Sequence, residues 1–352
     1  MRAPPSILLA AVAVAIGGCG GVRSPADRAP LAAAARPARS PVPTTPPAGR
    51  VVRVGALADA IAADPNAHTI AVAVHDPSRL VLLDARTGRI RERVAVPTGQ
   101  RHPGPPPAPA VFLVPGEVGR RALAIRPADR TPPAQLPQSA TVVLGRTFVA
   151  SARGAATVSV LDRGRPTAEL PETTRSGGLS PAAFDRRLAV VSLETRALEL
   201  YDPRTLRRLA HLPAGAGPTN VVAEGDRLYV ADTRGDAVLV FGTDGRLTRV
   251  GRIALPGGAP YGLALDPVRR RLWVTLTARN EVVALPTDGS RAPAVHLPTV
   301  QQPDAVAVDS ALGTVAVAGR AAGVVELIDR RHAYPPDESV RALLRRPAGA
   351  AG

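Results

Sequence analysis

Two aspartates, a tyrosine and an asparagine are the residues whose types and spacing come closest to a chemical site. Asp59, Tyr261 and Asp304 occupy equivalent places in a repeating pattern of short apolar runs, and Asn220 is one residue beyond that place in another copy. Carboxylate and amide oxygens are ligands for a hard cation such as Ca²⁺, and one of two close carboxylates can keep a proton and act as an acid. The alternative is that these side chains face water and accept hydrogen bonds from strand ends.

The segment "GQRHPGPPPAP" (99–109) supplies the cationic candidates beside these carboxylates. Arg101 and His102 are expected at the same end of the repeating units as Asp59 and Asp304, and the prolines fix the shape of the loop at low entropic cost. We therefore predict that this segment determines ligand specificity. Of the six histidines, only His102 is expected near the centre of the fold.

Patterns that identify common enzymes are missing from the sequence. No Gly-rich phosphate loop and no nucleophile–base arrangement stands out, and the C-x-x-C-H attachment of a covalent haem is absent. An arginine does recur in the loop between the second and third apolar run of every unit, and a ring of guanidinium groups would attract an anionic ligand. These arginines are Arg79, Arg120, Arg153, Arg196, Arg234, Arg279 and Arg320. The turns at the other end are equally rich in arginine, so composition alone explains much of this pattern.

The elements that must position these residues repeat about every 40 residues. A Leu-Pro or Val-Pro pair closes the last strand of each unit, and runs such as "TIAVAV" (69–74), "LYVAD" (228–232) and "LWVTL" (272–276) recur in step. The runs are almost continuously apolar, as expected for sheets covered on both faces. Four short strands repeating at this period indicate an all-β fold, the β-propeller, with four-stranded antiparallel blades.

Counting the second apolar run of each unit predicts seven blades. The last unit has only three strands, ending at Asp329, and the N-terminal segment from Val51 to Gly55 parallels the missing outer strand. We therefore predict that an N-terminal strand closes the ring in the last blade. The second unit is expected to be irregular, because the prolines of 99–109 cannot donate to a strand ladder.

The stretches "LYVADTRGDAVLVF", "FVASARGAATVSVLD" and "LWVTLTARNEVVAL" resemble the YVTN-type propeller repeat, with the NHL-type repeat close behind. The resemblance extends over residues 50 to 330 and concerns architecture more than activity. It implies an exported binding or surface protein; some members of such families are lyases or lactonases.

The N-terminus carries an export signal. Arg2 precedes an apolar run from Ile7 to Ile16, and "IGGC" (16–19) resembles the lipobox of bacterial lipoproteins, which implies that residues 1–18 are cleaved and Cys19 is lipid-modified. A plain signal peptide with an incidental cysteine is the alternative. Residues 19–49 are predicted to form a solvated Pro/Ala-rich tether, 50–330 the propeller, and 331–352 a C-terminal tail.

The net charge of +15 would ordinarily suggest nucleic acid, but all 44 basic residues are arginines scattered along the chain, and export argues against that partner. We therefore predict a monomer held at the cell membrane by its lipid and facing outside the cytoplasm, at the cell surface or in the periplasm. It would bind a protein or an anionic ligand without catalysis and without a cofactor, Ca²⁺ being the one possible exception. The alternative is a lyase or lactonase that uses a cation held by Asp59, Asp304 and Asn220.

Overall fold

The computed structural model describes residues 33–58, 60–75, 77, 79–95, 112–115, 122–125, 139–151, 157–162, 165–170, 179–244, 246–289 and 294–335. The chain divides into two compact units, Met1–Pro30 and Leu31–Gly352, and all described residues belong to the second. That unit is built almost entirely of antiparallel β-strands. In the described part of the chain, no helix has the length and apolar character needed to cross a membrane.

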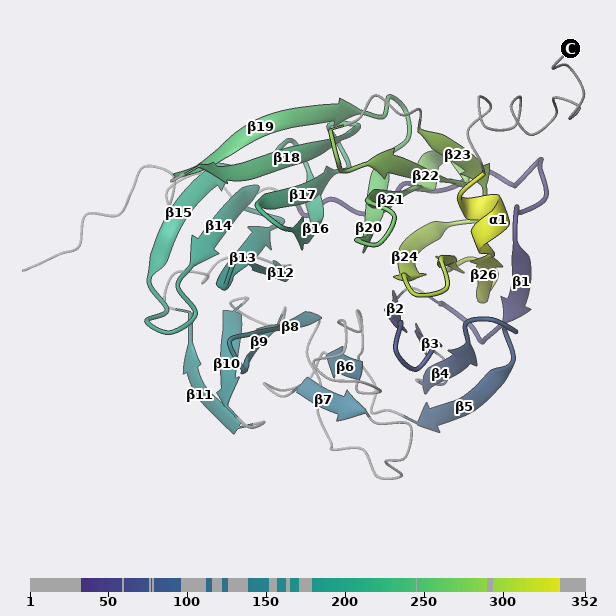
Figure 1. Cartoon of the computed structure of the whole chain (residues 1–352), viewed down its shortest axis with the longest axis horizontal. Coiled ribbons are helices and arrows are strands. Elements are labelled where there is room, and N and C mark those ends of the chain that lie inside the picture. The colour runs from purple at the N-terminus through teal and green to yellow at the C-terminus, as the bar shows by residue number, and fades with distance from the viewer. Residues whose placement is uncertain are drawn as a thin grey trace, which may run out of the picture. The chain divides into compact units, whose positions relative to one another are not determined.

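Six four-stranded antiparallel sheets form the blades of a propeller among the described residues, and their first strands surround a common centre (Figure 1). Five blades are continuous in sequence. From inner to outer strand they are β2–β5 (Ala60–Asp64, Thr69–Val74, Arg79–Asp84, Ile90–Ala95), β8–β11 (Ser139–Val143, Arg146–Ser151, Thr157–Asp162, Arg165–Glu169), β12–β15 (Leu179–Phe184, Arg187–Ser192, Ala197–Tyr201, Arg208–Pro213), β16–β19 (Pro218–Glu224, Arg227–Asp232, Ala237–Asp244, Arg246–Ala254) and β20–β23 (Pro260–Asp266, Arg271–Leu276, Glu281–Pro286, Val295–Pro298).

The sixth blade joins the two ends of the propeller, as predicted. Its strands β24 (Pro303–Asp309), β25 (Thr314–Gly319) and β26 (Val324–Ile328) are completed by β1 (Arg50–Arg53), which pairs antiparallel with β26 from Arg50 opposite Leu327 to Arg53 opposite Val324. This pairing removes the open edge that β26 would otherwise present.

The predicted seven-bladed count is wrong: the described residues form six four-stranded blades. Where a second unit was expected, the described residues form only a two-stranded hairpin, β6 (Phe112–Pro115) with β7 (Ala122–Ile125). The physical reason lies in the composition of the flanking sequence. Five prolines fall in 99–109, where the inner strand was expected, and proline has no amide hydrogen to donate to a ladder. Residues 99–109 lie outside the described residues.

The core lies between the faces of adjoining blades and consists mainly of Val, Leu, Ala and Ile side chains. Strands β3 and β25 are buried at every residue, whereas the outer strands β15 and β19 expose part of theirs. Large aromatic side chains also contribute to this core: Trp273, Tyr201 and Phe148 are completely buried. Sheets covered on both faces explain the continuous apolar runs of the sequence.

Aspartates at the ends of strands fix the turns on one side of the ring. Oδ1 of Asp64, Asp202 and Asp266 each accepts hydrogen bonds from the backbone amides two and three residues later. Such Asx turns satisfy amides that the sheet leaves unpaired. The acids that recur at the ends of the first apolar runs are thus structural where these bonds are described.

A short helix after the last strand packs against the same side. Helix α1 (Arg330–Ala333) begins at Asp329, whose carboxylate accepts from the amides of Arg331 and His332. Tyr334 follows it, donates to Asp266 Oδ2 at 2.5 Å and accepts from Trp273 Nε1 at 3.0 Å. Burial and the Asp266 carboxylate raise the pKa of Tyr334 far above its usual range. The beginning of the predicted tail is therefore anchored to the propeller.

Candidate functional site

The predicted site residues that the structure describes, Asn220, Tyr261 and Asp304, belong to one rim of the ring. We call it the loop rim: it carries the loops that join the second to the third strand of each blade and the fourth strand to the next blade. The described loops are bonded alike in successive blades, because a second-to-third-strand loop donates an amide to the carbonyl of the loop that enters its blade. These pairs are His75 to Ala56, Thr233 to Gly217, Ala278 to Gly258 and Arg320 to Gln302, at 2.9–3.2 Å. The repeated bond holds the rim loops in fixed positions.

A buried aspartate organises one of these loop pairs. Asp232 accepts from the amides of Ala216 (3.1 Å), Gly217 (2.7 Å) and Gly235 (3.2 Å). A Cβ at Gly235 would lie 2.0 Å from Asp232 Oδ2, so only glycine allows the loop to close around this carboxylate. Asp236, in the loop that follows Asp232, likewise accepts from the amides of Gly257 and Ala259 in the loop between β19 and β20.

The structure brings two of the predicted site residues together and places a third on the next inner strand. Asn220 on β16 donates from Nδ2 to the main-chain carbonyl of Tyr261 on β20 at 2.9 Å. Asp304 lies on β24, and the adjoining Gly262 is so close to it that a Cβ there would lie 3.0 Å from the Asp304 carbonyl oxygen. Asp304 is only 3 % exposed, and its Oδ1 accepts from Gln302 Nε2 at 2.9 Å.

The other predicted functional residues lie outside the described residues: Cys19, Asp59, Arg101 and His102. The proposed pair of Asp59 and Asp304 carboxylates is therefore a prediction that these data do not test. Among the residues that are described, no three His, Cys, Asp or Glu side chains come together in a group that could hold a metal ion.

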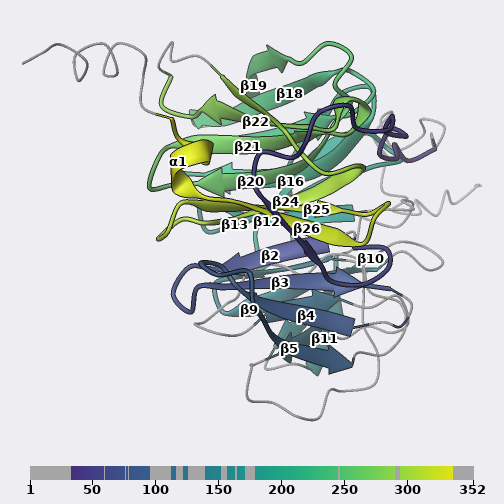
Figure 2. The ribbon, with the colours of Figure 1, turned by 90° about the vertical axis from the view of Figure 1, so that its right-hand side faces the viewer.

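An N-terminal segment that the sequence assigned to a solvated tether lies along the loop rim. We call residues 33–41 the strap. In the edge-on view of Figure 2 the purple N-terminal segment starts on the right of the ring, whereas α1 lies on the left. Ala35 and Ser40 of the strap are buried, at 3 % and 8 % exposure. The strap is therefore packed against the propeller rather than freely solvated.

The first half of the strap contacts the β16–β19 blade. The Arg234 guanidinium donates to the carbonyl oxygens of Ala33 (2.9 Å) and Ala34 (3.2 Å). Ala35 follows and lies against Gly217, where a Cβ would be 3.0 Å from the Ala35 Cβ and 2.7 Å from the Arg234 side chain. Glycine at 217 thus leaves the space that the strap occupies.

The second half is bonded to the β20–β23 blade and the loop before β24. The Ala38 amide donates to Thr277 Oγ1 at 3.2 Å, and Ser40 Oγ donates to the Thr277 carbonyl at 2.5 Å. Gln302 both donates to the Ala38 carbonyl (2.8 Å) and accepts from the Ser40 amide (3.0 Å). The same Gln302 amide group reaches Asp304, so one side chain links the strap to the predicted site.

The strap's last bonds are to Pro41. Its carbonyl oxygen accepts from Asn280 Nδ2 at 2.9 Å and from Gln301 Nε2 at 3.1 Å. Asn280 and Gln302 both have left-handed backbone conformations, with φ of 53° and 56°. Residues other than glycine rarely adopt this conformation, and the side-chain amides of both residues bond main-chain atoms of the strap.

The predicted ring of loop-rim arginines stays a prediction, but two of its described members, Arg234 and Arg279, are bonded to carbonyl oxygens. Arg234 donates to the strap carbonyls, and Arg279 donates to the carbonyl of Pro256 and lies 4.0 Å from the Glu281 carboxylate. Arg120 and Arg153 lie outside the described residues.

A buried glutamate ties the closing strand to the loop rim. Glu326 on β26 is fully buried; Oε1 accepts from the Gly49 amide at 2.5 Å and Oε2 accepts from the Thr299 hydroxyl. Burial raises the pKa of Glu326, although both donors favour the charged form.

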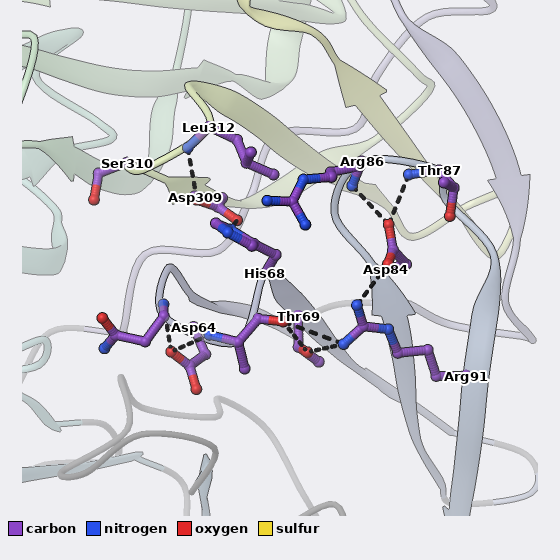
Figure 3. A network of polar contacts seen from close by, with 12 residues as sticks. Asp64, His68, Thr69, Asp84, Arg86, Thr87, Arg91, Asp309, Ser310 and Leu312 are labelled. Carbon is purple, nitrogen blue, oxygen red and sulfur yellow. Dashed lines mark hydrogen bonds and ion pairs between the residues drawn. The ribbon is translucent and has the colours of Figure 1, made fainter.

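The opposite rim holds a polar network at the junction of the first and last blades (Figure 3). His68 Nδ1 lies 2.9 Å from Oδ2 of the fully buried Asp309, whose Oδ1 accepts from the Leu312 amide. Asp84 nearby accepts from Arg91 at 2.5 Å and from the amides of Arg86 and Thr87. Burial opposes ionisation of Asp84, but these donors outweigh it and hold its pKa well below its usual range. The network fastens the junction of the ring.

A separate cleft of about 440 Å³ lies at the outer strands of the β12–β15 blade, where β19 of the next blade begins. Leu200, Leu209, Ala210, Leu212 and Leu247 supply its apolar lining, and Arg187, His211 and Arg246 its polar one. His211 Nδ1 lies 3.1 Å from the buried Glu199, which also accepts from Tyr201 and Arg208. None of the predicted site residues lines this cleft.

Comparison with known proteins supports the propeller fold and leaves the function open. No protein-family model matches the chain, and no curated protein is similar enough in sequence to match it. Solved structures do resemble it: Kuenenia stuttgartiensis hydrazine synthase (TM-score 0.66, 16 % identity, 79 % of this chain and 97 % of that one), streptogramin B lyase (0.60, 16 %, 81 % and 95 %) and a chain of the mitotic checkpoint complex (0.65, 12 %, 84 % and 98 %). At these identities the likeness concerns the fold alone.

Sequence reasoning missed the residues that hold the strap: Arg234 was seen only as one of a ring of cations, and Thr277, Asn280, Gln301 and Gln302 were not singled out. Their partners are main-chain atoms of a segment more than 190 residues away in sequence.

Proposed function

We propose that the protein is a lipid-anchored, extracytoplasmic binding module whose loop rim takes a protein partner. One observation carries this proposal: the loop rim already binds a peptide segment, the strap, through side chains from the β16–β19 and β20–β23 blades and the loop before β24. A surface that recognises one extended main chain has the chemistry to recognise another.

The rim chemistry favours a protein over an anionic ligand. The Arg234 and Arg279 guanidinium groups bond carbonyl oxygens, and Asn280 and Gln302 present neutral amides. An anion site would instead need several cationic groups directed at one point. The export signal and lipobox predicted at residues 1–19 would place this rim outside the cytoplasm, away from nucleic acid. The rim is formed by a single chain, which is consistent with the predicted monomer.

Cross-linking on intact cells tests the proposal. A partner should be recovered with the native chain, and its recovery should fall at least tenfold with Arg234→Ala combined with Gln302→Asn. Arg234 bonds the first residues of the strap, and Gln302 bonds Ala38 and Ser40 in its second half. Arg246→Ala, an exposed arginine at the outer cleft, is the matched control and should leave recovery unchanged. Equal recovery by the double variant and the control would refute the loop rim as the binding surface.

The metal content of the purified protein distinguishes the binding module from the predicted alternative, a cation-dependent lyase or lactonase. A stoichiometric Ca²⁺ or Mg²⁺ in the purified protein that is lost on Asp304→Asn would favour the enzyme over the binding module.

A further inference from the structure

The strap contacts show what the loop rim recognises. Seven hydrogen bonds join rim side chains to strap main-chain atoms, from the Ala33 carbonyl to the Pro41 carbonyl. Side chains of the strap contribute little by comparison: Arg36 and Arg39 are exposed. The rim therefore recognises an extended backbone, with little dependence on the side chains at positions 36 and 39.

Two strap positions are nevertheless restricted in size. Ala35 is buried beside Gly217. Ser40 is also buried: its hydroxyl donates to the Thr277 carbonyl and accepts from the backbone amide of Gln302 at 3.1 Å. Between and after them come Pro37 and Pro41, which favour the extended conformation and lower the entropy lost on binding. The pattern is therefore a small residue at 35, a proline at 37 and a Ser-Pro pair at 40–41.

The strap ends abruptly, which separates it from the closing strand. Beyond Pro41, Val42 is 79 % exposed, and regular pairing resumes only at Arg50 in β1. Residues 42–46, which connect the strap to the closing strand, are all exposed and so do not themselves hold the strap in place. A segment tethered in this way competes at an effective concentration on the order of millimolar.

We infer that the loop rim between Arg234 and Gln302 is a binding site for extended, proline-containing peptide segments, and that the strap is its resident competitor. The inference rests on the proposed function and specifies its partner: a protein that presents a segment of this pattern. Such a partner gains the rim only by displacing the strap, which also changes the partners of Gln302 and hence the surroundings of Asp304.

The test uses the full chain in detergent with residues 33–41 replaced by a Gly-Ser sequence of equal length. A fluorescein-labelled peptide of residues 33–43 should bind this chain saturably in fluorescence anisotropy, and should bind the native chain at least tenfold more weakly because the native strap competes. Asn280→Gly, which keeps the left-handed turn but removes the amide, should weaken peptide binding to the Gly-Ser chain several-fold.

Peptide variants make the test specific. Ala35→Leu should abolish peptide binding because Gly217 leaves no room for the larger side chain, whereas Arg39→Leu, at an exposed position, should leave it unchanged. No saturable binding to the Gly-Ser chain, or equal binding of the Ala35→Leu and native peptides, would overturn the inference. Neither result would overturn the proposed function, which the experiments on intact cells test separately.

Discussion

If β1 closes the ring, alanine substitutions at two valines three residues apart should lower the free energy of unfolding by very different amounts. Val54, which follows β1, is 5 % exposed and packs in the cluster that includes Ile61, Val325 and Leu327, whereas Val51 within β1 is 43 % exposed. Val54→Ala and Val51→Ala remove the same two methyl groups from the same segment, so the pair is internally matched.

The expected magnitudes follow from burial. Removing two buried methyl groups at about 0.8 kcal/mol each, with a contribution from the cavity left behind, destabilises the Val54→Ala protein by about 2 kcal/mol. The half-exposed Val51 loses less, within about 0.5 kcal/mol. In a domain of this size about 2 kcal/mol lowers the melting temperature by roughly 3 °C.

Thermal unfolding of both variants, followed by circular dichroism, measures the difference. In a separate comparison, a chain that lacks residues 20–56 should melt at a lower temperature than one that lacks only 20–48, because the longer deletion removes β1. Equal melting temperatures for the two valine variants, together with equal values for the two deletions, would show that β1 does not close the ring.

Three further predictions concern the anchor, a buried acid and the proline-rich segment. Cys19→Ser should move the protein from the membrane fraction to the soluble fraction; sedimentation with membranes at high salt would contradict lipid anchoring. Because the pKa of Glu326 is raised in the folded state, its favourable contribution is complete below the unfolded value and declines as pH rises through the folded one. Glu326→Gln should therefore gain melting temperature relative to the native chain at pH 7.5 compared with pH 4, and a larger gain at pH 4 would refute this. Replacing 101–108, which includes Arg101 and His102, by a Gly-Ser loop of equal length should abolish partner capture with little change in melting temperature; unchanged capture would remove both residues from the site.

Many strands of the propeller could be predicted from the sequence, because strands buried on both faces appear as nearly continuous apolar runs. The run predicted at 69–74 is β3, and the runs at 228–232 and 272–276 fall within β17 and β21. The pairing of the N-terminus with the last blade followed from a repeat that lacked one strand. These features depend on apolar periodicity, which a single sequence displays.

The blade count failed because apolar runs reveal strands but do not reveal whether four of them complete a sheet. The apolar stretches "FLVP" (112–115) and "ALAI" (122–125) do form strands, β6 and β7, yet the described residues pair these two strands only with each other. The prolines in the flanking segments were recognised as poor ladder donors, and their effect was underestimated.

The site was predicted only in part, because its decisive contacts are made by polar loops. Asn220 donates a hydrogen bond to the Tyr261 carbonyl, so these two residues lie together, while their role in binding stays a prediction. The strap was missed because its sequence is poor in large apolar residues, which normally indicates solvation. Its attachment depends on amide and hydroxyl groups that bond its main chain, and main-chain recognition has no side-chain pattern.

Site-specific photo-cross-linking on intact cells tests the central claim, that the loop rim is the binding surface, most directly. Arg279→p-benzoylphenylalanine places the reactive group on the loop rim, where the native side chain is 41 % exposed, and Val268→p-benzoylphenylalanine places it on the opposite rim at a residue that is 66 % exposed. Irradiation should give a discrete protein adduct from position 279 and none from position 268. An adduct from position 268 alone would contradict the account.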